Sequence, residues 1–439
     1  MSIVAPDSRF PEHLAEMARR ADAALGRGGY DALALAAGSP PLHYRDDQHY
    51  PHRAVAHFLA WAPLPDAPAS LVVYRPGRRP TLLFYQPDDY WHAPPSIPEE
   101  RWLDSYEVVR LKQPAEASQH LPPRTAYVGP PADWLGSTSG VAINPESVVA
   151  ALDYGRAAKT EYELECLAIA SRRAVPAHRA ALAAWTDGAC EYEIHLAYVA
   201  ATGQEEWELP YTNIIAANEA SAVLHYTVRR REAPSPRRSF LIDAGAQYRG
   251  YAADITRSHA AADGVFAELI SALAGMESRL CDLVTVGRHY PEIHQAAHVG
   301  IGEILARLGI VRCTAAAAVE SGLTKVFFPH GIGHLLGLQV HDVGGWFADA
   351  SGLLTPRPAA HPFLRLGRTL AEGTVVTIEP GIYFIPLLLE AARADGRGRD
   401  INWQRVEELA PYGGVRIEDN VVATANGPRN LTREAGLAP

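Results

Sequence analysis

Four carboxylates and one histidine, each within or at the end of a short apolar run, constrain this chain more than any other feature. They are Asp243 (S-F-L-I-D-A-G), Asp254 (Y-A-A-D-I-T-R), His334 (P-H-G-I-G-H), Glu379 (T-I-E-P-G) and Glu418 (V-R-I-E-D-N). A charged side chain in apolar surroundings is costly unless something neutralises it. Two divalent cations would balance four carboxylates and leave room for a bridging hydroxide as nucleophile. The pattern therefore predicts a two-metal centre.

The two aspartates are separated by A-G-A-Q-Y-R-G-Y-A-A, in which Gly245 and Gly250 indicate a turn. The aspartates could then face each other across a hairpin, so that one holds a single metal ion and the other bridges both. Two such aspartates are also ordinary turn residues. The buried-strand context of I-D-A-G favours the role of metal ligands.

Three histidines, His330, His334 and His341, lie among glycines in P-H-G-I-G-H-L-L-G-L-Q-V-H-D-V-G-G. The glycines let backbone approach a crowded site, and an imidazole can ligate a metal or carry a proton. The two glutamates have a competing interpretation as partners of arginines. For Glu418 that alternative is specific, because Arg416 lies two residues earlier on the same face of the strand.

Length and charge set the remaining limits. A chain of 439 residues predicts two domains, and a net charge of −10 argues against a nucleic-acid groove. Four scattered cysteines, a start without a secretory pattern and the lack of a bilayer-spanning apolar run predict a cytoplasmic protein with no membrane contact.

The first part of the chain alternates helical and strand patterns, with a hairpin expected where Leu71–Tyr74 and Thr81–Tyr85 flank R-P-G-R-R-P. Thr160 and Glu163 form a capping box that opens a long helix. The expected division is therefore a smaller α/β domain over residues 1–156 and a catalytic domain over residues 157–439. The fold class is α+β.

The motifs I-D-A-G…D-I-T-R, H-G-I-G-H-x-x-G-x-x-V-H-D, I-E-P-G-I-Y and V-R-I-E-D together resemble the pita-bread metallopeptidases. This family includes methionine aminopeptidase, aminopeptidase P, creatinase and prolidase. The resemblance covers about residues 155–439, and the first 150 residues look like the smaller domain of the creatinase, aminopeptidase P and prolidase branch. Within that branch the chain is most similar to prolidases, the Xaa-Pro dipeptidases.

The resemblance implies roles for individual residues. Asp243 would hold one metal ion and His334 with Glu379 the other, while Asp254 and Glu418 bridge the two. Manganese is the expected metal, with zinc, cobalt or magnesium as alternatives, because four carboxylates and one histidine form a hard ligand set.

The remaining implied roles concern catalysis and the substrate. Glu379 would also carry a proton from the hydroxide to the leaving proline nitrogen, and His341 would stabilise the oxyanion. His225 would approach the proline end of an Xaa-Pro dipeptide, and Tyr211 its amino end. Arg365, fourteen residues before Glu379, would bind the free carboxylate and so enforce dipeptide length.

Two further expectations concern neighbouring parts of the protein. Trp91 resembles an aromatic residue that reaches the partner's pocket in prolidase dimers, so a homodimer is expected. His330 has no implied metal role and would support the walls of the site.

Three alternatives are weighed at this point. Aminopeptidase P, which removes an N-terminal residue before proline from longer peptides, shares the fold and the ligands, but Arg365 argues against it. Methionine aminopeptidase does not need the first 150 residues. A catalytically silent binding relative would keep the fold and lose ligands, whereas all five ligands are present here.

Overall fold

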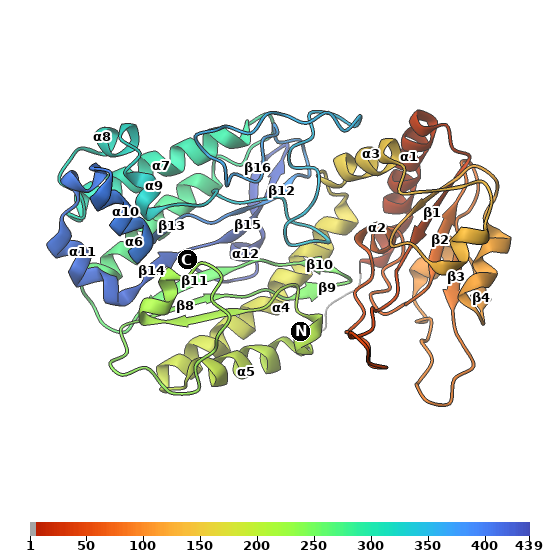
Figure 1. The fold of residues 1–439 in the computed structure, drawn as a ribbon, viewed down its shortest axis with the longest axis horizontal. Helices are drawn as coiled ribbons and strands as arrows, with labels where there is room; N and C mark the ends of the chain where they lie inside the picture. The colour runs from red at the N-terminus through yellow and green to blue at the C-terminus, as the bar shows by residue number, and fades with distance from the viewer. Residues whose placement is uncertain (1–5) are drawn as a thin grey trace.

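The computed structural model describes residues 6–439, which form two parts (Figure 1). The smaller part, red to orange in Figure 1, contains one sheet of six strands in the spatial order β4-β3-β2-β1-β5-β6. These strands are β1 (Ala32–Ala36), β2 (Leu71–Tyr74), β3 (Thr81–Tyr85), β4 (Glu107–Leu111), β5 (Thr125–Val128) and β6 (Val141–Ile143). Strands β2 and β3 pair antiparallel, which confirms the expected hairpin.

Three helices accompany this sheet: α1 (Phe10–Gly28), α2 (Ala56–Leu59) and α3 (Glu146–Arg156). The longest, α1, buries Phe10, Leu14, Met17, Ala21 and Leu25. Their spacing of three or four residues places them on one helical face. Helix α1 ends at Gly28 and is capped by Gly29, whose φ of 73° requires the left-handed region that glycine adopts without strain.

The junction between the two parts is short. Helix α3 ends at Arg156, and α4 (Glu161–Thr186) begins directly after Thr160, whose capping box with Glu163 is present as expected. Just before this helix, Arg156 Nη2 lies 2.5 Å and Lys159 Nζ 3.1 Å from the buried carboxylate of Asp342. Because Asp342 follows His341 in the chain, this ion-pair cluster ties the junction to the histidine-containing segment.

The larger part contains four small sheets. Their strands are β7 (Ile214–Ala217), β8 (Ser239–Asp243), β9 (Gln247–Tyr248), β10 (Tyr251–Ala252), β11 (Thr256–Ala260), β12 (Val375–Ile378), β13 (Gly381–Tyr383), β14 (Gly414–Arg416), β15 (Asp419–Thr424) and β16 (Gly427–Asn430). The two three-stranded sheets have the orders β11-β8-β7 and β12-β15-β16. An antiparallel bridge between Thr256 and Glu418 joins them.

Helices lie outside these strands (Figure 1). The remaining helices are α5 (Glu191–Thr202), α6 (Val265–Cys281), α7 (Tyr290–Arg307), α8 (Ala315–Glu320), α9 (Thr324–Phe327), α10 (Pro386–Ala394), α11 (Trp403–Leu409) and α12 (Leu431–Glu434). Helices α4 and α5 contact strands β7 to β10, and α6 contacts β11, β12 and β14. Antiparallel sheets covered by layers of helices confirm the expected α+β class.

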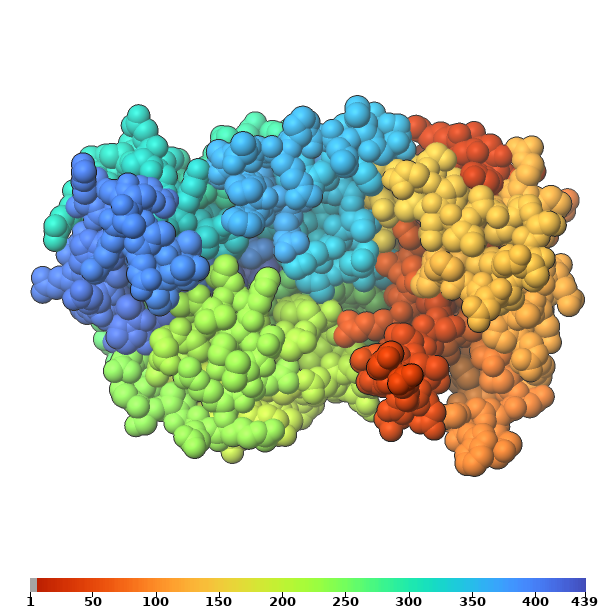
Figure 2. Space-filling model, viewed as in Figure 1, coloured from red at the N-terminus to blue at the C-terminus, as the bar shows by residue number. Residues whose placement is uncertain are grey.

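The two parts are packed against each other rather than held at a distance (Figure 2). One hydrophobic core contains residues from both, including Phe10 and Leu25 of α1 with Tyr162 and Leu167 of α4. Within residues 6–439, no helix combines the length and the apolar composition that crossing a lipid bilayer requires.

Candidate metal centre and active site

Asp243 and Asp254 face each other as the hairpin interpretation predicts. Asp243 ends β8, and Asp254 lies between β10 and β11, where Asp243 pairs with Thr256. The hydroxyl oxygen of Tyr211 lies between the two carboxylates, 2.7 Å from Asp243 Oδ1 and 2.6 Å from Asp254 Oδ1. One hydroxyl hydrogen can be donated to only one of two ionised carboxylates at a time. The two carboxylates therefore need either further positive charge beside them or a proton on one of them.

His334 is oriented by the strand beside it. Its backbone N–H donates to Thr377 Oγ1 at 3.1 Å, and its Nδ1 lies 3.0 Å from the carbonyl oxygen of Leu335. That contact makes Nδ1 the protonated nitrogen and leaves the Nε2 lone pair for a ligand. Nε2 lies 3.5 Å from Asp254 Oδ2 and 3.6 Å from Glu379 Oε1.

The glycine before His334 explains how the backbone comes so close. Gly333 has a φ of 154°, and a Cβ there would lie 2.1 Å from the carbonyl oxygen of Thr377. No other residue fits this approach without moving the strand. Gly333 thus allows the backbone at His334 to lie close to strand β12.

The two glutamates complete the group. Glu379 directly follows β12, and Glu418 lies between β14 and β15. Single ligand atoms of Asp254, His334 and Glu418 all lie within 4.8 Å of one another. All five side chains of the expected ligand set line one cavity of about 1480 Å³, together with residues 52–57 of the smaller part.

The electrostatics of the cavity show an excess of negative charge. Burial, followed by the charges of Asp254 and Glu379, raises the pKa of Glu418 well above its ordinary value. Burial also raises the pKa of Glu379 to about 7. Burial acts to raise the pKa of Asp254, but in the metal-free protein the hydrogen bond and charge of protonated His334, with other neighbours, outweigh it, so the pKa of that carboxyl is lowered. Converging carboxylates that burial drives towards protonation are the donor set that hard divalent cations bind, so these residues fit such a metal.

Arg416 does not pair with Glu418, which was the alternative interpretation of that glutamate. Its Nη2 lies 2.6 Å from Asp243 Oδ2, and its Nη1 lies 3.0 Å from the hydroxyl of Tyr383. Glu418 Oε2 instead accepts a 2.6 Å hydrogen bond from Thr256 Oγ1. Sequence reasoning missed Thr256, although it stands only two residues after Asp254.

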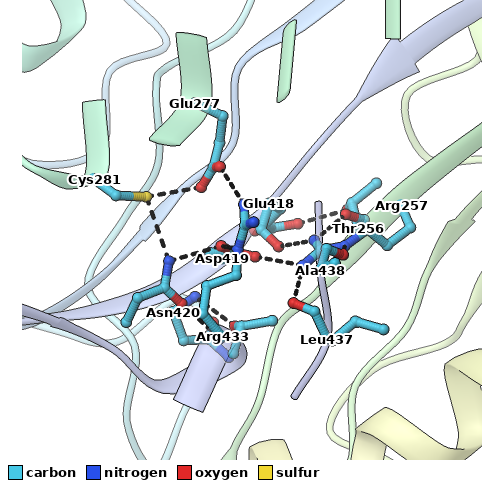
Figure 3. Close-up of polar contacts among 12 residues, drawn as sticks. Thr256, Arg257, Glu277, Cys281, Glu418, Asp419, Asn420, Arg433, Leu437 and Ala438 are labelled. Atoms are coloured by element: carbon cyan, nitrogen blue, oxygen red, sulfur yellow. Dashed lines mark hydrogen bonds and ion pairs between the residues drawn. The ribbon is translucent and has the colours of Figure 1, made fainter. Parts of the chain in front are cut away.

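A buried polar network lies behind Glu418 (Figure 3). Arg257 donates to the backbone oxygen of Glu418 at 2.9 Å and to Asp419 Oδ1 at 2.7 Å. Arg433 pairs with Asp419 and with Glu277, whose other oxygen accepts from Cys281 at 2.7 Å. Because two guanidinium groups already neutralise these carboxylates, the cluster is an ion-pair network that fixes the strand carrying Glu418.

The other expected site residues also border the cavity. Tyr211, His225, His341 and Arg365 line it, as does His330, whose Nε2 lies 2.9 Å from the Tyr383 hydroxyl. His341 stacks edge-on against His334 with ring centroids 4.4 Å apart. Trp91 is 77% exposed and, in the described part of the chain, is not among the residues that line the cavity.

Comparisons with known proteins identify the family of this chain. Residues 8–154 match the family model described as Xaa-Pro dipeptidase, N-terminal domain, and residues 165–425 match Metallopeptidase family M24. An Xaa-Pro dipeptidase of Xanthomonas campestris pv. campestris (strain 8004) is 48% identical over 434 residues, which covers 98% of each chain. One of Stenotrophomonas maltophilia (strain K279a) is 46% identical over 439 residues, covering 99% of this chain and 98% of that one.

Solved structures show the same fold. Aminopeptidase P from E. coli with the inhibitor Pro-Leu matches with a TM-score of 0.74 at 21% identity, covering 99% of this chain and 96% of that one. Pseudomonas aeruginosa aminopeptidase PepP matches with a TM-score of 0.71 at 22% identity, with the same coverage. The chain therefore belongs to metallopeptidase family M24 and carries the N-terminal domain of the Xaa-Pro dipeptidases.

Proposed function

We propose that this enzyme hydrolyses Xaa-Pro dipeptides at a centre of two divalent metal ions. The observation that carries the proposal is the convergence of Asp243, Asp254, His334, Glu379 and Glu418 in one cavity. Full-length similarity of 46–48% to Xaa-Pro dipeptidases supports the substrate class. The sequence motifs and the family match support the dinuclear centre.

The proposed ligand assignment rests on the family resemblance of the motifs. Asp243 would hold one ion and His334 with Glu379 the other, while Asp254 and Glu418 would be shared between them. Asp254 suits a bridge because it lies between Tyr211 on the Asp243 side and His334 on the other. Manganese is the proposed metal, since carboxylate oxygens dominate the set.

The positive charge of Arg416 also enters the charge balance of the proposed metal centre. Two divalent cations offset four carboxylates, and the guanidinium of Arg416 offsets the additional negative charge of a hydroxide. This balance favours a hydroxide over a neutral water as the nucleophile that the ions would supply. When bound, the ions would polarise the substrate carbonyl and supply the hydroxide nucleophile.

Two side chains of the protein, Glu379 and His341, handle protons and charge during the proposed reaction. Glu379 is proposed to take the proton of the nucleophile and deliver it to the proline nitrogen. Burial, together with the charges of His334 and Arg365, lowers the pKa of His341 to about 4. A neutral His341 can still donate its remaining N–H to the oxyanion.

Substrate length is the proposed task of Arg365. Its side chain is exposed at the cavity wall, and its charge reaches His341, so a carboxylate could bind there within the length of a dipeptide. His225, also exposed at the wall, is proposed to contact the proline end, and Tyr211 the amino end.

Three further expectations stay predictions. A homodimer is supported by Tyr90 and Trp91, which are 86% and 77% exposed. A domain boundary between residues 156 and 157 is supported by the end of α3 at Arg156. A cytoplasmic location rests on the dispersed cysteines, all four of which are free.

Hydrolysis of Xaa-Pro and Xaa-Pro-Yaa, compared in manganese-loaded protein, tests the proposal. A dipeptidase cleaves the dipeptide and leaves the tripeptide. Comparable rates on both would instead indicate aminopeptidase P activity. If neither is cleaved and no manganese is retained after chelation and reloading, the chain is a binding relative.

A further inference from the structure

Three imidazoles converge at a second position, outside the proposed metal centre. His294 and His298 lie one turn apart on α7, and His361 comes from the irregular segment that leads to Arg365. Their ring centroids form a triangle with sides of 4.7, 4.4 and 5.1 Å. One ring nitrogen from each residue lies within 4.8 Å of the other two.

The hydrogen bonds of this histidine cluster orient the rings and leave one nitrogen unsatisfied. His298 Nδ1 lies 2.9 Å from Thr324 Oγ1 at the start of α9, which leaves the opposite nitrogen available to the cluster. His294 Nε2 lies 2.9 Å from His361 Nδ1. His294 is 2% exposed, yet its Nδ1 has no hydrogen-bond partner among the described residues. Buried polar atoms without a partner are rare and require an explanation.

The protonation state of the cluster suits metal binding. Burial, reinforced by the neighbouring imidazoles, lowers the pKa of His294 to about 2, and burial lowers that of His298 to about 4. The pKa of His361 is lowered as well. All three rings are therefore neutral near pH 7, the form in which imidazole ligates a metal. Lys325 is the charged residue that acts on all three, and its charge opposes a bound cation.

We propose that His294, His298 and His361 bind one zinc-like transition-metal ion, separate from the two-metal centre. Three imidazole nitrogens with a fourth position left for water are a common zinc arrangement. The two sites differ in chemistry, because nitrogen ligands favour zinc, cobalt, nickel or copper, whereas the carboxylate-rich centre favours manganese. The contact of His298 with Thr324 would serve as the outer hydrogen bond that fixes a ligating ring.

Such an ion would connect helix α7 to the wall of the cavity. Residues 362–365, directly after His361, line the cavity and include Arg365. A metal bridge from His361 to His294 and His298 would restrain that segment. This consequence can be measured as slower hydrogen exchange over residues 361–365, without any assay of peptide cleavage.

The number of bound metal ions distinguishes binding at the histidine cluster from binding at the proposed two-metal centre. Chelated protein is saturated with Zn²⁺, freed of excess ion by gel filtration and analysed for bound zinc. Wild-type protein should retain about three ions per chain, and His361→Phe and His298→Leu about two each. Asp254→Asn, which damages the other centre, should still retain the ion of the histidine cluster. If the two-metal proposal is wrong, wild type should therefore still bind about one zinc ion more per chain than His361→Phe.

Two further variants exclude a folding defect as the cause. Thr324→Val should weaken the binding of this zinc ion about 10–100-fold while all three histidines remain. Lys325→Met should strengthen it, because it removes the opposing charge. The proposal is overturned if wild type and His361→Phe retain equal zinc, or if zinc slows exchange over residues 361–365 equally in both.

Discussion

The guanidinium of Arg416 is bound to the carboxylate of Asp243, with Nη2 2.6 Å from Oδ2. Both side chains are nearly buried, so the arginine acts as a built-in cation beside a proposed metal ligand. Removing one partner of a buried ion pair leaves an uncompensated charge and costs about 3–5 kcal/mol. The contribution of this pair can therefore be measured as stability of the metal-free protein, independently of metal binding.

Arg416→Met should lower the free energy of unfolding of the chelated protein by about 3 kcal/mol, because Asp243 then has no cation. Urea unfolding at pH 7 measures the change. Arg405→Met is the matched control, since Arg405 pairs with Glu408 at the surface, where loss of the pair costs at most about 1 kcal/mol. Equal losses in the two variants would contradict the role assigned to Arg416.

Thr256→Val should weaken manganese binding about 10–100-fold, because it removes the hydroxyl that orients Glu418 Oε2 at 2.6 Å. Calorimetric titration of the chelated protein measures this affinity. Thr186→Val removes a hydroxyl that bonds only to the backbone oxygen of Leu182 at the end of α4, and should leave the affinity unchanged. Unaltered affinity in Thr256→Val would show that Glu418 needs no such support.

Arg365→Ala should erase the preference for dipeptides, because the carboxylate of the substrate loses its partner. The value of kcat/KM for Xaa-Pro should fall while that for Xaa-Pro-Yaa stays or rises. Arg357→Ala is a suitable control, since this arginine also lines the cavity but lies over the ring of Trp346. Wild-type selectivity in Arg365→Ala would remove the assignment.

Lowering the pH should destabilise the folded protein, because buried histidines stay neutral in the folded state and take up a proton on unfolding. Burial lowers the pKa of His178 from 6.5 to about 3, and its Nε2 lies 2.9 Å from the backbone oxygen of Ala244. Between these two values the unfolded state takes up a proton that the folded state refuses, so stability falls as the pH falls. One such group costs about 1.4 kcal/mol per pH unit in that window.

Unfolding of chelated protein between pH 7 and pH 4.5 measures this slope. His178→Gln should reduce the slope by the contribution of one proton, whereas His49→Gln, at an exposed position, should leave it unchanged. Carboxylates also titrate in this range, but they contribute equally to all three proteins. A slope that is the same in His178→Gln as in wild type would contradict a buried, neutral His178.

The local features of the sequence were sufficient for several elements of the fold. Thr160 and Glu163 predicted the start of α4 because a capping box acts over three residues. The turn between β2 and β3 could likewise be predicted from the consecutive residues R-P-G-R-R-P. The five proposed ligands could be singled out because charged side chains within apolar runs are rare and each lies in a distinctive motif.

Partners across the fold could not be read from the sequence. Alternation along a strand places Arg416 and Glu418 on one face and suggested their pairing, but the sheet brings Asp243, 173 residues earlier, to the guanidinium. In the same way, His361 reaches His294 over 67 positions. Such contacts depend on which strands and helices become neighbours, and local patterns do not determine that.

Manganese binding to wild type and Asp254→Asn tests the central claim most directly. Asp254 is the proposed bridge between both ions, so its loss should leave the protein folded but unable to hold the pair. We expect about two manganese ions per wild-type chain, with hydrolysis of Xaa-Pro, and neither property in Asp254→Asn. Equal manganese content and equal hydrolysis in the two proteins would contradict the account.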